Sequence, residues 1–370
     1  MELSFYIADF QSGDLIDTLP LESVRLSSSL QPGQFQADLD LRKTGRSMGE
    51  ARDLLDLLRA GRATLVPIRE GVSTGPGNPP TSLALGEWWI ASATGSHRSP
   101  IARLAGPEFA GYAKHVMLWD DFVSQSADPV VTMRQMLWDL YTTEQTVTVD
   151  LQSWISHTGA RVAVDARKYT TDHWSAISDL QDADGGPFEW MIRAGLVQSG
   201  WIPERVTRRL EVGQPVLSLN RPDITLEVSA PDAPPASLVD ASWGWDETAS
   251  ANWVFGLGAG RGDDRVGPVQ STRSRVTGEP VKSRTVTDPD AMTTAQIRRV
   301  TRSSLARLSP DERVRTASMP ASRYTPRTGE AYSWRADESW TRAAESGTVR
   351  CVGWSWSSQS PDVYELDLVR

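Results

Sequence analysis

The stretch VRLSSSLQPGQFQADLDL, residues 24–41, decides the fold of the first part of the chain. Apolar residues alternate with polar ones on both sides of the Pro32-Gly33 dipeptide. Successive side chains of a strand point to opposite faces, so a period of two predicts a β-hairpin with one face in the core and one in water.

A helix is predicted directly after this hairpin. Ser47 and Glu50 have the spacing of a capping box, and Gly61 can end the helix. The residues between them form one apolar stripe: Ala51, Leu54, Leu55 and Leu58. Further strands are expected over residues 63–69, 83–93 and 100–105, with a Gly/Pro-rich loop over residues 71–80. Residues 1–125 therefore predict a small β-barrel or sandwich with one packed helix.

A middle unit of α+β type is expected over residues 126–239. Asp128 followed by Pro129 is typical of a helix start, and a second helix begins near Asp172. The pattern then changes to a period of two from Phe188, with a return strand over residues 202–212. Five prolines between residues 214 and 235 indicate an edge strand and a connector, because proline removes a ladder donor.

The last unit, residues 240–370, is expected to be β-rich again, with a helix over residues 290–308 and final strands over residues 349–357 and 363–369. The predicted fold class is thus α+β and β-rich. It consists of two β units around one helix each (1–125 and 240–370), which flank the middle domain (126–239).

Composition narrows the possible functions. The single cysteine, Cys351, excludes an internal disulfide framework and a cysteine-rich metal cluster. No apolar run approaches the ~20 residues that span a membrane, and the start MELSFYIADFQSGD lacks a secretory leader. We therefore expect a soluble chain without stable membrane insertion. Tryptophan is abundant, with 15 residues, and indicates core and interface packing.

Charge argues against nucleic acid as a partner. Residues 261–350 carry 17 basic and 11 acidic side chains, a net charge of +6, whereas the rest of the chain carries a net −15. A sequence-specific nucleic-acid binder usually shows a concentrated basic patch. Here the net positive charge of residues 261–350 is small, and acidic residues lie among the basic ones.

The stretch WGWDETASANWVFGLGAGRGDD, residues 243–264, suggests three functions: a nucleotide loop, an adhesion tripeptide or a sugar-binding aromatic patch. A dinucleotide fingerprint needs a third glycine that opens a helix. Arg261 takes that position, and the Asp263-Asp264 pair that follows repels phosphate. The tripeptide Arg261-Gly262-Asp263 is more typical of a tight turn.

Catalytic signatures are also missing. The run Gly353-Trp354-Ser355-Trp356-Ser357 lacks the second glycine of a hydrolase elbow, and all four histidines precede it, whereas the elbow requires a later one. The histidines have no zinc-binding spacing, and adjacent acids such as Asp120-Asp121 are typical of solvated turns. We predict no enzyme activity, no cofactor, no metal and no catalytic residue.

What remains of residues 243–264 is a strand, residues 252–257, that leads into a glycine turn. Glycines there allow positive φ or close backbone approach. We interpret the stretch as an assembly feature, and its predicted interface residues are Trp243, Trp245, Trp253, Gly256, Gly258 and Gly260.

Three segments resemble the tail-hub minor tail proteins of long-tailed bacteriophages that infect actinobacteria. They are DHWSAISDLQDADGGPFEWMIR (residues 172–193), NWVFGLGAGRGDDRV (252–266) and VGWSWSSQSPDVYELDLVR (352–370). The likeness extends over the whole chain in element order and length, and its motifs are packing patterns rather than catalytic signatures.

The resemblance implies two tube-like β-barrel domains per subunit and a homotrimer below the tail tube, in which six barrels form a pseudo-sixfold ring. The implied partners are the distal tail protein ring, the C-terminus of the tape-measure protein, and downstream tail-tip and receptor-binding proteins. The implied place is the distal end of the virion tail, where the hub lines the genome ejection channel. A carbohydrate-binding or glycan-cleaving tail protein that uses Trp243, Trp245 and Trp253 remains the alternative, with a secreted β-sandwich adhesin as a further one.

Overall fold

The computed structural model describes most of the chain. The described residues are 3–59, 61–72, 81–96, 98–142, 146–153, 155–181, 188–199, 202–229, 237–243, 251–260, 262–272, 281–287, 293–307, 315–322, 324–337 and 344–369.

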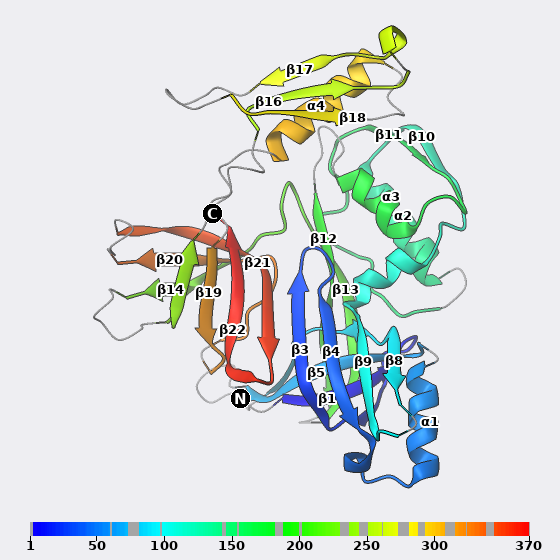
Figure 1. Cartoon of the computed structure of the whole chain (residues 1–370), viewed down its shortest axis with the longest axis vertical. Coiled ribbons are helices and arrows are strands. Elements are labelled where there is room, and N and C mark those ends of the chain that lie inside the picture. The colour runs from blue at the N-terminus through cyan, green and yellow to red at the C-terminus, as the bar shows by residue number, and fades with distance from the viewer. Residues whose placement is uncertain are drawn as a thin grey trace.

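One sheet of ten strands joins the two ends of the chain (Figure 1). Eight of its strands follow one another as neighbours in the order β15 (Asp240–Trp243), β19 (Arg315–Pro320), β22 (Ser360–Val369), β21 (Glu345–Ser357), β3 (Leu21–Ser29), β4 (Gln34–Asp40), β9 (Ile101–Pro107) and β8 (Ser92–Gly95). The other two, β20 (Glu330–Ala336) and β14 (Leu219–Val228), continue from β21. The predicted hairpin is confirmed as β3 and β4, at the centre of this order.

The connection between the two ends is the antiparallel pairing of β21 with β3, in which Gly353–Ser357 lie opposite Ser29–Arg25. One face of the sheet packs against the hydrophobic core and the other faces solvent, as the alternation in residues 24–41 predicts. Val24, Leu26, Phe35 and Leu39 are buried, whereas Arg25 and Gln36 are exposed.

A second sheet covers the core face around β3, β4 and β9. Its strands are β2 (Leu15–Thr18), β1 (Leu3–Asp9), β5 (Ala63–Val72), β6 (Thr81–Ala84) and β7 (Trp88–Trp89). Strand β5 is buried on both faces: Leu65 belongs to the main core, and Val66 packs with Val206 on the other side. A doubly covered strand explains the unbroken apolar run at this point of the sequence.

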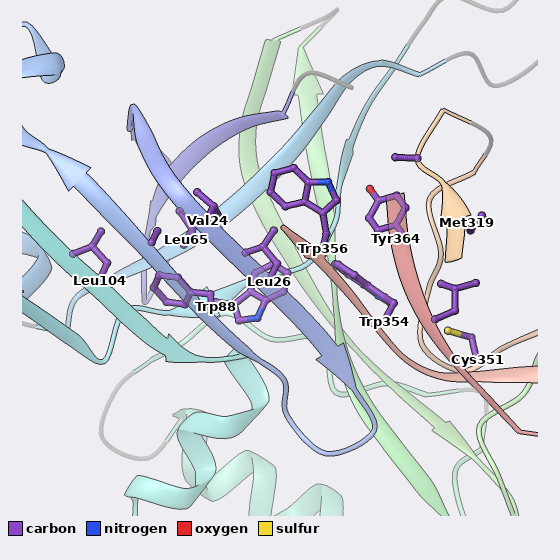
Figure 2. Packing of buried hydrophobic residues seen from close by; sticks show 14 of the residues in the cluster. Val24, Leu26, Leu65, Trp88, Leu104, Met319, Cys351, Trp354, Trp356 and Tyr364 are labelled. Atoms are coloured by element: carbon purple, nitrogen blue, oxygen red, sulfur yellow. The ribbon is translucent and has the colours of Figure 1, made fainter. Parts of the chain in front are cut away.

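The main core holds tryptophans from both ends of the chain (Figure 2). Trp88 and Trp354 meet edge to face with 6.3 Å between ring centroids, and Trp354 meets Tyr364 in the same way at 5.6 Å. The Trp88 indole N–H donates to the Ser27 carbonyl over 3.1 Å. These rings fill the space between the N-terminal and C-terminal strands, so the two β units share one core.

Helix α1 (Met48–Arg59) begins with the predicted capping box. The Ser47 N–H donates to Glu50 Oε2 over 2.9 Å, and the Glu50 N–H is 3.4 Å from Ser47 Oγ. The helix follows the short turn η1 (Leu41–Thr44), and Gly61 ends it with φ +65°. In Figure 1, α1 lies beside β8 at the edge of the large sheet.

The strand expected over residues 83–93 is wrong: the chain forms three short strands there, β6, β7 and β8. The break between β6 and β7 contains Gly86 and Glu87, and the Glu87 side chain is buried. Glu87 bonds to Thr64 and Arg208 at this point, so the chain leaves the strand path to reach these partners.

The middle unit has its own core, formed by helices, two two-stranded sheets and the turn η2 (Phe109–His115). Asp128 Oδ1 accepts from the Val130 N–H over 3.0 Å and so caps α2 as predicted. Asp172 caps α3 through the Ser175 N–H over 2.9 Å. The elements are α2 (Pro129–Thr142), α3 (His173–Gln181), β10 (Phe122–Ala127), β11 (Val162–Ala166), β12 (Glu189–Ser199) and β13 (Ile202–Gly213).

The predicted edge strand in the proline-rich connector is β14, which pairs with β20 and has a register shift between Arg221 and Thr225 around Pro222. A small unit is inserted between β15 and β19 and lies apart from the large sheet at the top of Figure 1. Its three strands and one helix are β16 (Trp253–Leu257), β17 (Val269–Thr272), β18 (Ser283–Thr287) and α4 (Thr294–Arg307). The predicted helix of the C-terminal part is therefore α4, and it packs on this inserted sheet.

Candidate assembly interface

The predicted interface residues do not form one site, because residues 243–264 cross from one unit to another. Trp243 is the last residue of β15 in the large sheet, where its backbone pairs with Arg315. Trp253 begins β16 in the inserted unit, opposite Thr272 and Ser283. Trp245 lies outside the described residues. The stretch is thus a connection between the large sheet and the inserted unit.

Gly256 faces helix α4 within the same chain. A methyl group at this position would overlap the Thr301 hydroxyl and lie 2.9 Å from Ile297 Cγ1. The neighbouring Val254 is fully buried, and Val269 and Ile297 form the small core beside it. Glycine is required at residue 256 because the helix approaches the strand this closely.

Trp253 and Phe255 lie on the opposite face of β16, since side chains alternate along a strand. Both are half-buried, and their rings are tilted by 67° with centroids 6.3 Å apart. Their cross-strand neighbours on this face are small or neutral polar residues: Gln270, Thr272, Ser283 and Thr285. The two rings are tilted rather than coplanar, and of the rings that the carbohydrate alternative uses, Trp245 lies outside the described residues.

The glycine turn after β16 is closed by backbone hydrogen bonds. The Gly258 N–H donates to the Val266 carbonyl over 2.8 Å, and the Val266 N–H donates to the Ala259 carbonyl over 2.8 Å. Arg265 Nε adds a bond to the Gly258 carbonyl at 3.0 Å. Gly260 has φ +99°, a conformation that glycine adopts without strain. Residues 262–264 form only a short 3-10 turn, η3 (Gly262–Asp264), so no helix N-terminus follows the glycines.

Among the described residues the large sheet has two open edges, which the sequence alone does not predict. Within the described part of the chain, the eight-strand order ends at β15 on one side and at β8 on the other. An unpaired edge strand presents a row of N–H and C=O groups to any strand that lies alongside. No residue motif marks such edges, because strand order follows from pairings between distant segments.

The solvent-facing side of the sheet between these edges is mainly polar, with Ile101 and Val363 as apolar exceptions. It presents small hydroxyl and amide side chains together with four acids and two arginines: Asp38, Asp240, Glu365, Asp367, Arg25 and Arg103. Arg103 Nε lies 3.4 Å from Asp38 Oδ1, so one arginine is already paired with an acid. Over β3, β4, β21 and β22 the face is hollowed into a depression of about 440 Å³ lined by Arg25, Gln34, Gln36, Ser355 and Glu365.

Glu108 and Cys351 are two titratable groups whose pKa values are raised by burial. Burial raises the pKa of Glu108 to about 7, although the Gly33 N–H donates to its Oε2 over 2.8 Å. The cavity next to Glu108 has a volume of only about 10 Å³, which leaves no space for a substrate. Burial also raises the pKa of the Cys351 thiol to about 12, so this cysteine is not a nucleophile.

Within the described ranges, no three His, Cys, Asp or Glu side chains are grouped to hold a metal ion. His173 is fully buried, with Nδ1 2.9 Å from the Val116 carbonyl and Nε2 3.2 Å from Asp139 Oδ2, so it joins α3 to α2. None of the described helices has the length and apolar character needed to span a bilayer.

Comparison with solved structures identifies the fold. The tail protein from Neisseria meningitidis MC58 aligns with 100% of this chain and 97% of its own, with a TM-score of 0.59 and 15% identity. The 43 kDa tail protein of prophage MuSo2 from Shewanella oneidensis aligns over 99% and 98% of the two chains, with a TM-score of 0.56 and 7% identity. Prophage tail protein gp18 from Listeria monocytogenes EGD-e aligns over 99% and 94%, with a TM-score of 0.50 and 11% identity.

No family model matches the sequence, and no curated protein matches it. The solved structures show that the chain has the fold of phage tail proteins over its whole length. The predicted fold class, α+β and β-rich with a tail-protein architecture, is therefore confirmed. Within the described residues the sheets follow open orders rather than closed barrels.

Proposed function

We propose that this chain is a structural component of a bacteriophage tail, the central hub that assembles as a closed homotrimer. The observation that carries the proposal is the eight-strand order from β15 to β8, which has two open edges and one polar face. Joining the β8 edge of one copy to the β15 edge of the next gives a head-to-tail contact, and such contacts form rings when the rotation closes.

In such a ring the polar face would point inward and line the channel. Its side chains are mainly Ser, Thr and Gln with acids in excess over arginines, as described above. A surface with this charge repels the DNA backbone, so the DNA does not bind to it and is not slowed during ejection. An assembled channel with a neutral or positive lining would contradict this part of the proposal.

The proposed neighbours follow from the place of a hub in the tail. They are the distal tail protein ring, the tape-measure protein C-terminus, and downstream tail-tip and receptor-binding proteins. The proposed location is the distal end of a siphophage tail. An actinobacterial host fits the composition, in which only Lys43, Lys114, Lys168 and Lys282 are lysines. No enzyme activity, cofactor or sequence-specific nucleic-acid contact is part of the proposal.

Mass in solution and symmetry by electron microscopy test the proposal directly. The full chain is expected to give a species of three times 40.7 kDa with threefold rings. Addition of a purified distal tail protein would favour the same rings if the isolated chain associates weakly. A chain that stays monomeric under both conditions and binds cell-wall glycans would contradict the hub and support the carbohydrate-binding alternative.

A further inference from the structure

A cationic groove lies at the β8 end of the large sheet. It has a volume of about 830 Å³ and separates helix α1 from the hairpin of β8 and β9. Apolar side chains form part of its lining, with Met48 and Ile101 exposed by 78% and 41%. Residues Ala93–Gly95 of β8 also line it, so the open edge strand belongs to the same surface.

The charge of this groove is opposite to that of the whole protein. Four arginines line it and one acid, Asp56, accompanies them: the arginines are Arg42, Arg46, Arg52 and Arg98. The chain as a whole has a formal net charge of −9. Four cations in one groove of an acidic protein indicate an anionic partner.

Two of the four arginines are already engaged. Arg42 Nη2 lies 2.8 Å from Asp40 Oδ2, and Arg46 is paired with Asp17. Arg52 and Arg98 are exposed, and neither has an acidic partner within the described residues. Arg52 and Arg98 are therefore the cations available to a second molecule.

The opposite end of the same sheet has complementary chemistry. Val239 is 53% exposed and Asp240 is exposed, and the Asp240 carboxylate accepts a hydrogen bond from the N–H of its neighbour Ala241 over 2.8 Å. Strand β15 pairs with β19 on one side, and its other side is open in the described part of the chain. This end offers an apolar side chain, an acid and a free strand edge.

We infer that the groove between α1 and β8–β9 of one subunit receives the β15 edge, Val239–Trp243, of a second copy. The inference rests on the proposed trimer and names its contact surfaces. Because neighbouring side chains of a strand point to opposite faces, Val239 covers the exposed Met48 of α1, and Asp240, on the polar face, pairs with Arg98 of the β8–β9 turn in the neighbour. Because β15 and β8 end opposite sides of one sheet, each subunit donates one edge and receives one edge.

Cysteine cross-linking tests which edges meet. Thr94 on β8 and Ser242 on β15 are both exposed, whereas the single native cysteine is fully buried. Thr94→Cys and Ser242→Cys chains are purified separately, mixed and oxidised. A disulfide-linked dimer is expected from the mixture and not from either chain alone, and the double variant is expected to give covalent trimers. Thr94→Cys mixed with Gln125→Cys, an exposed site on β10, is the matched control and is expected to remain unlinked.

Charge reversal tests the chemistry independently. Arg98→Glu is expected to raise the trimer dissociation constant by on the order of tenfold or more, since a like charge then faces Asp240. Adding Asp240→Arg is expected to recover assembly, which a misfolded protein could not do. Arg161→Glu, an exposed arginine of the middle unit, is the control and leaves assembly unchanged.

The outcomes separate this inference from the proposed function. Threefold rings that form without the Thr94–Ser242 cross-link and ignore the charge reversals would overturn the edge contact and leave the hub intact. A chain that remains monomeric with a distal tail protein present would overturn both. Cross-linking together with charge-swap rescue supports both.

Discussion

Arg208 and Glu87 form a buried bidentate ion pair that joins β13 of the middle unit to the N-terminal β unit. Arg208 Nε lies 2.8 Å from Glu87 Oε2 and Nη2 lies 2.7 Å from Oε1, and the two side chains are 1% and 2% exposed. Arg208 Nη1 also donates to the Phe10 carbonyl over 2.8 Å, and its guanidinium lies over the Phe109 ring at 4.2 Å. The Thr64 hydroxyl donates to Glu87 over 2.6 Å, so both charges have several partners.

Arg208→Met is expected to destabilise the protein by about 3–5 kcal/mol, because it leaves the Glu87 carboxylate buried without its cation. The double variant Arg208→Met with Glu87→Leu is expected to recover most of this loss, since it removes both charges. Urea denaturation followed by tryptophan fluorescence measures the change. Arg335→Met is the control, because its partner Glu227 lies 3.5 Å away at an exposed site and such pairs contribute about 0–1 kcal/mol. Equal losses in both arginine variants would contradict the prediction.

Gly256→Ala is expected to destabilise the inserted unit by about 1–3 kcal/mol through overpacking against α4. The added methyl group overlaps the Thr301 hydroxyl, so Thr301→Ala in the same chain is expected to restore part of the stability. Hydrogen exchange is the suitable measurement, because it reports α4 and the large sheet separately. Faster exchange in β21 and β22 than in α4 would show that the effect is not local.

Gly258→Val tests the interface assigned to the glycine turn. We expect this variant to impair trimer formation, because Gly258 is buried and closes the turn through its bond to Val266. Sedimentation velocity and electron microscopy measure the assembly, while circular dichroism confirms that the subunit is folded. Normal threefold rings from a folded Gly258→Val protein would remove the turn from the interface.

Glu108 gives the stability a pH dependence of known sign. Burial raises its pKa from the ordinary 4.5 to about 7 in the folded protein. Its contribution is therefore fully present below pH 4.5 and is lost as the pH rises through about 7. The shift corresponds to about 3 kcal/mol over this range.

The measurement compares wild type with Glu108→Gln, whose amide oxygen can still accept from Gly33. The unfolding free energy of wild type relative to the variant is expected to fall between pH 5 and pH 8. Urea denaturation at several pH values within this window gives that difference. A difference that stays constant with pH would contradict the assigned burial of the carboxyl group.

Local patterns predicted the elements well where side-chain period and capping chemistry agreed. The hairpin β3–β4, the Ser47–Glu50 capping box and the Asp128 cap all follow from spacings of a few residues, and the structure has each of them. The strand expected over residues 83–93 failed for a physical reason. Glu87 leaves the strand to meet Arg208, and no local pattern contains a partner that lies so far along the chain.

The arrangement of the candidate interface could not be predicted from the sequence, for a similar reason. The sequence identified Trp253 and the glycine turn, but not that Gly256 faces α4 while Trp253 faces away from it. It also could not indicate that Arg52 and Arg98 line one groove, because α1 and the β8–β9 hairpin come together only in the fold. The two domain boundaries, at residues 125 and 239, stay predictions, although the large sheet crosses both of them.

The pairing of β3 with β21 also sets an order for synthesis. Residues 25–29 leave the ribosome long before their partners, residues 353–357, are translated. Throughout elongation one side of the nascent hairpin lacks its neighbour, and Trp354 is absent from the core around Trp88. The large sheet is therefore completed only once residues 353–357 have been made, and a chain that terminates before them exposes the unpaired edge of β3 to other nascent proteins.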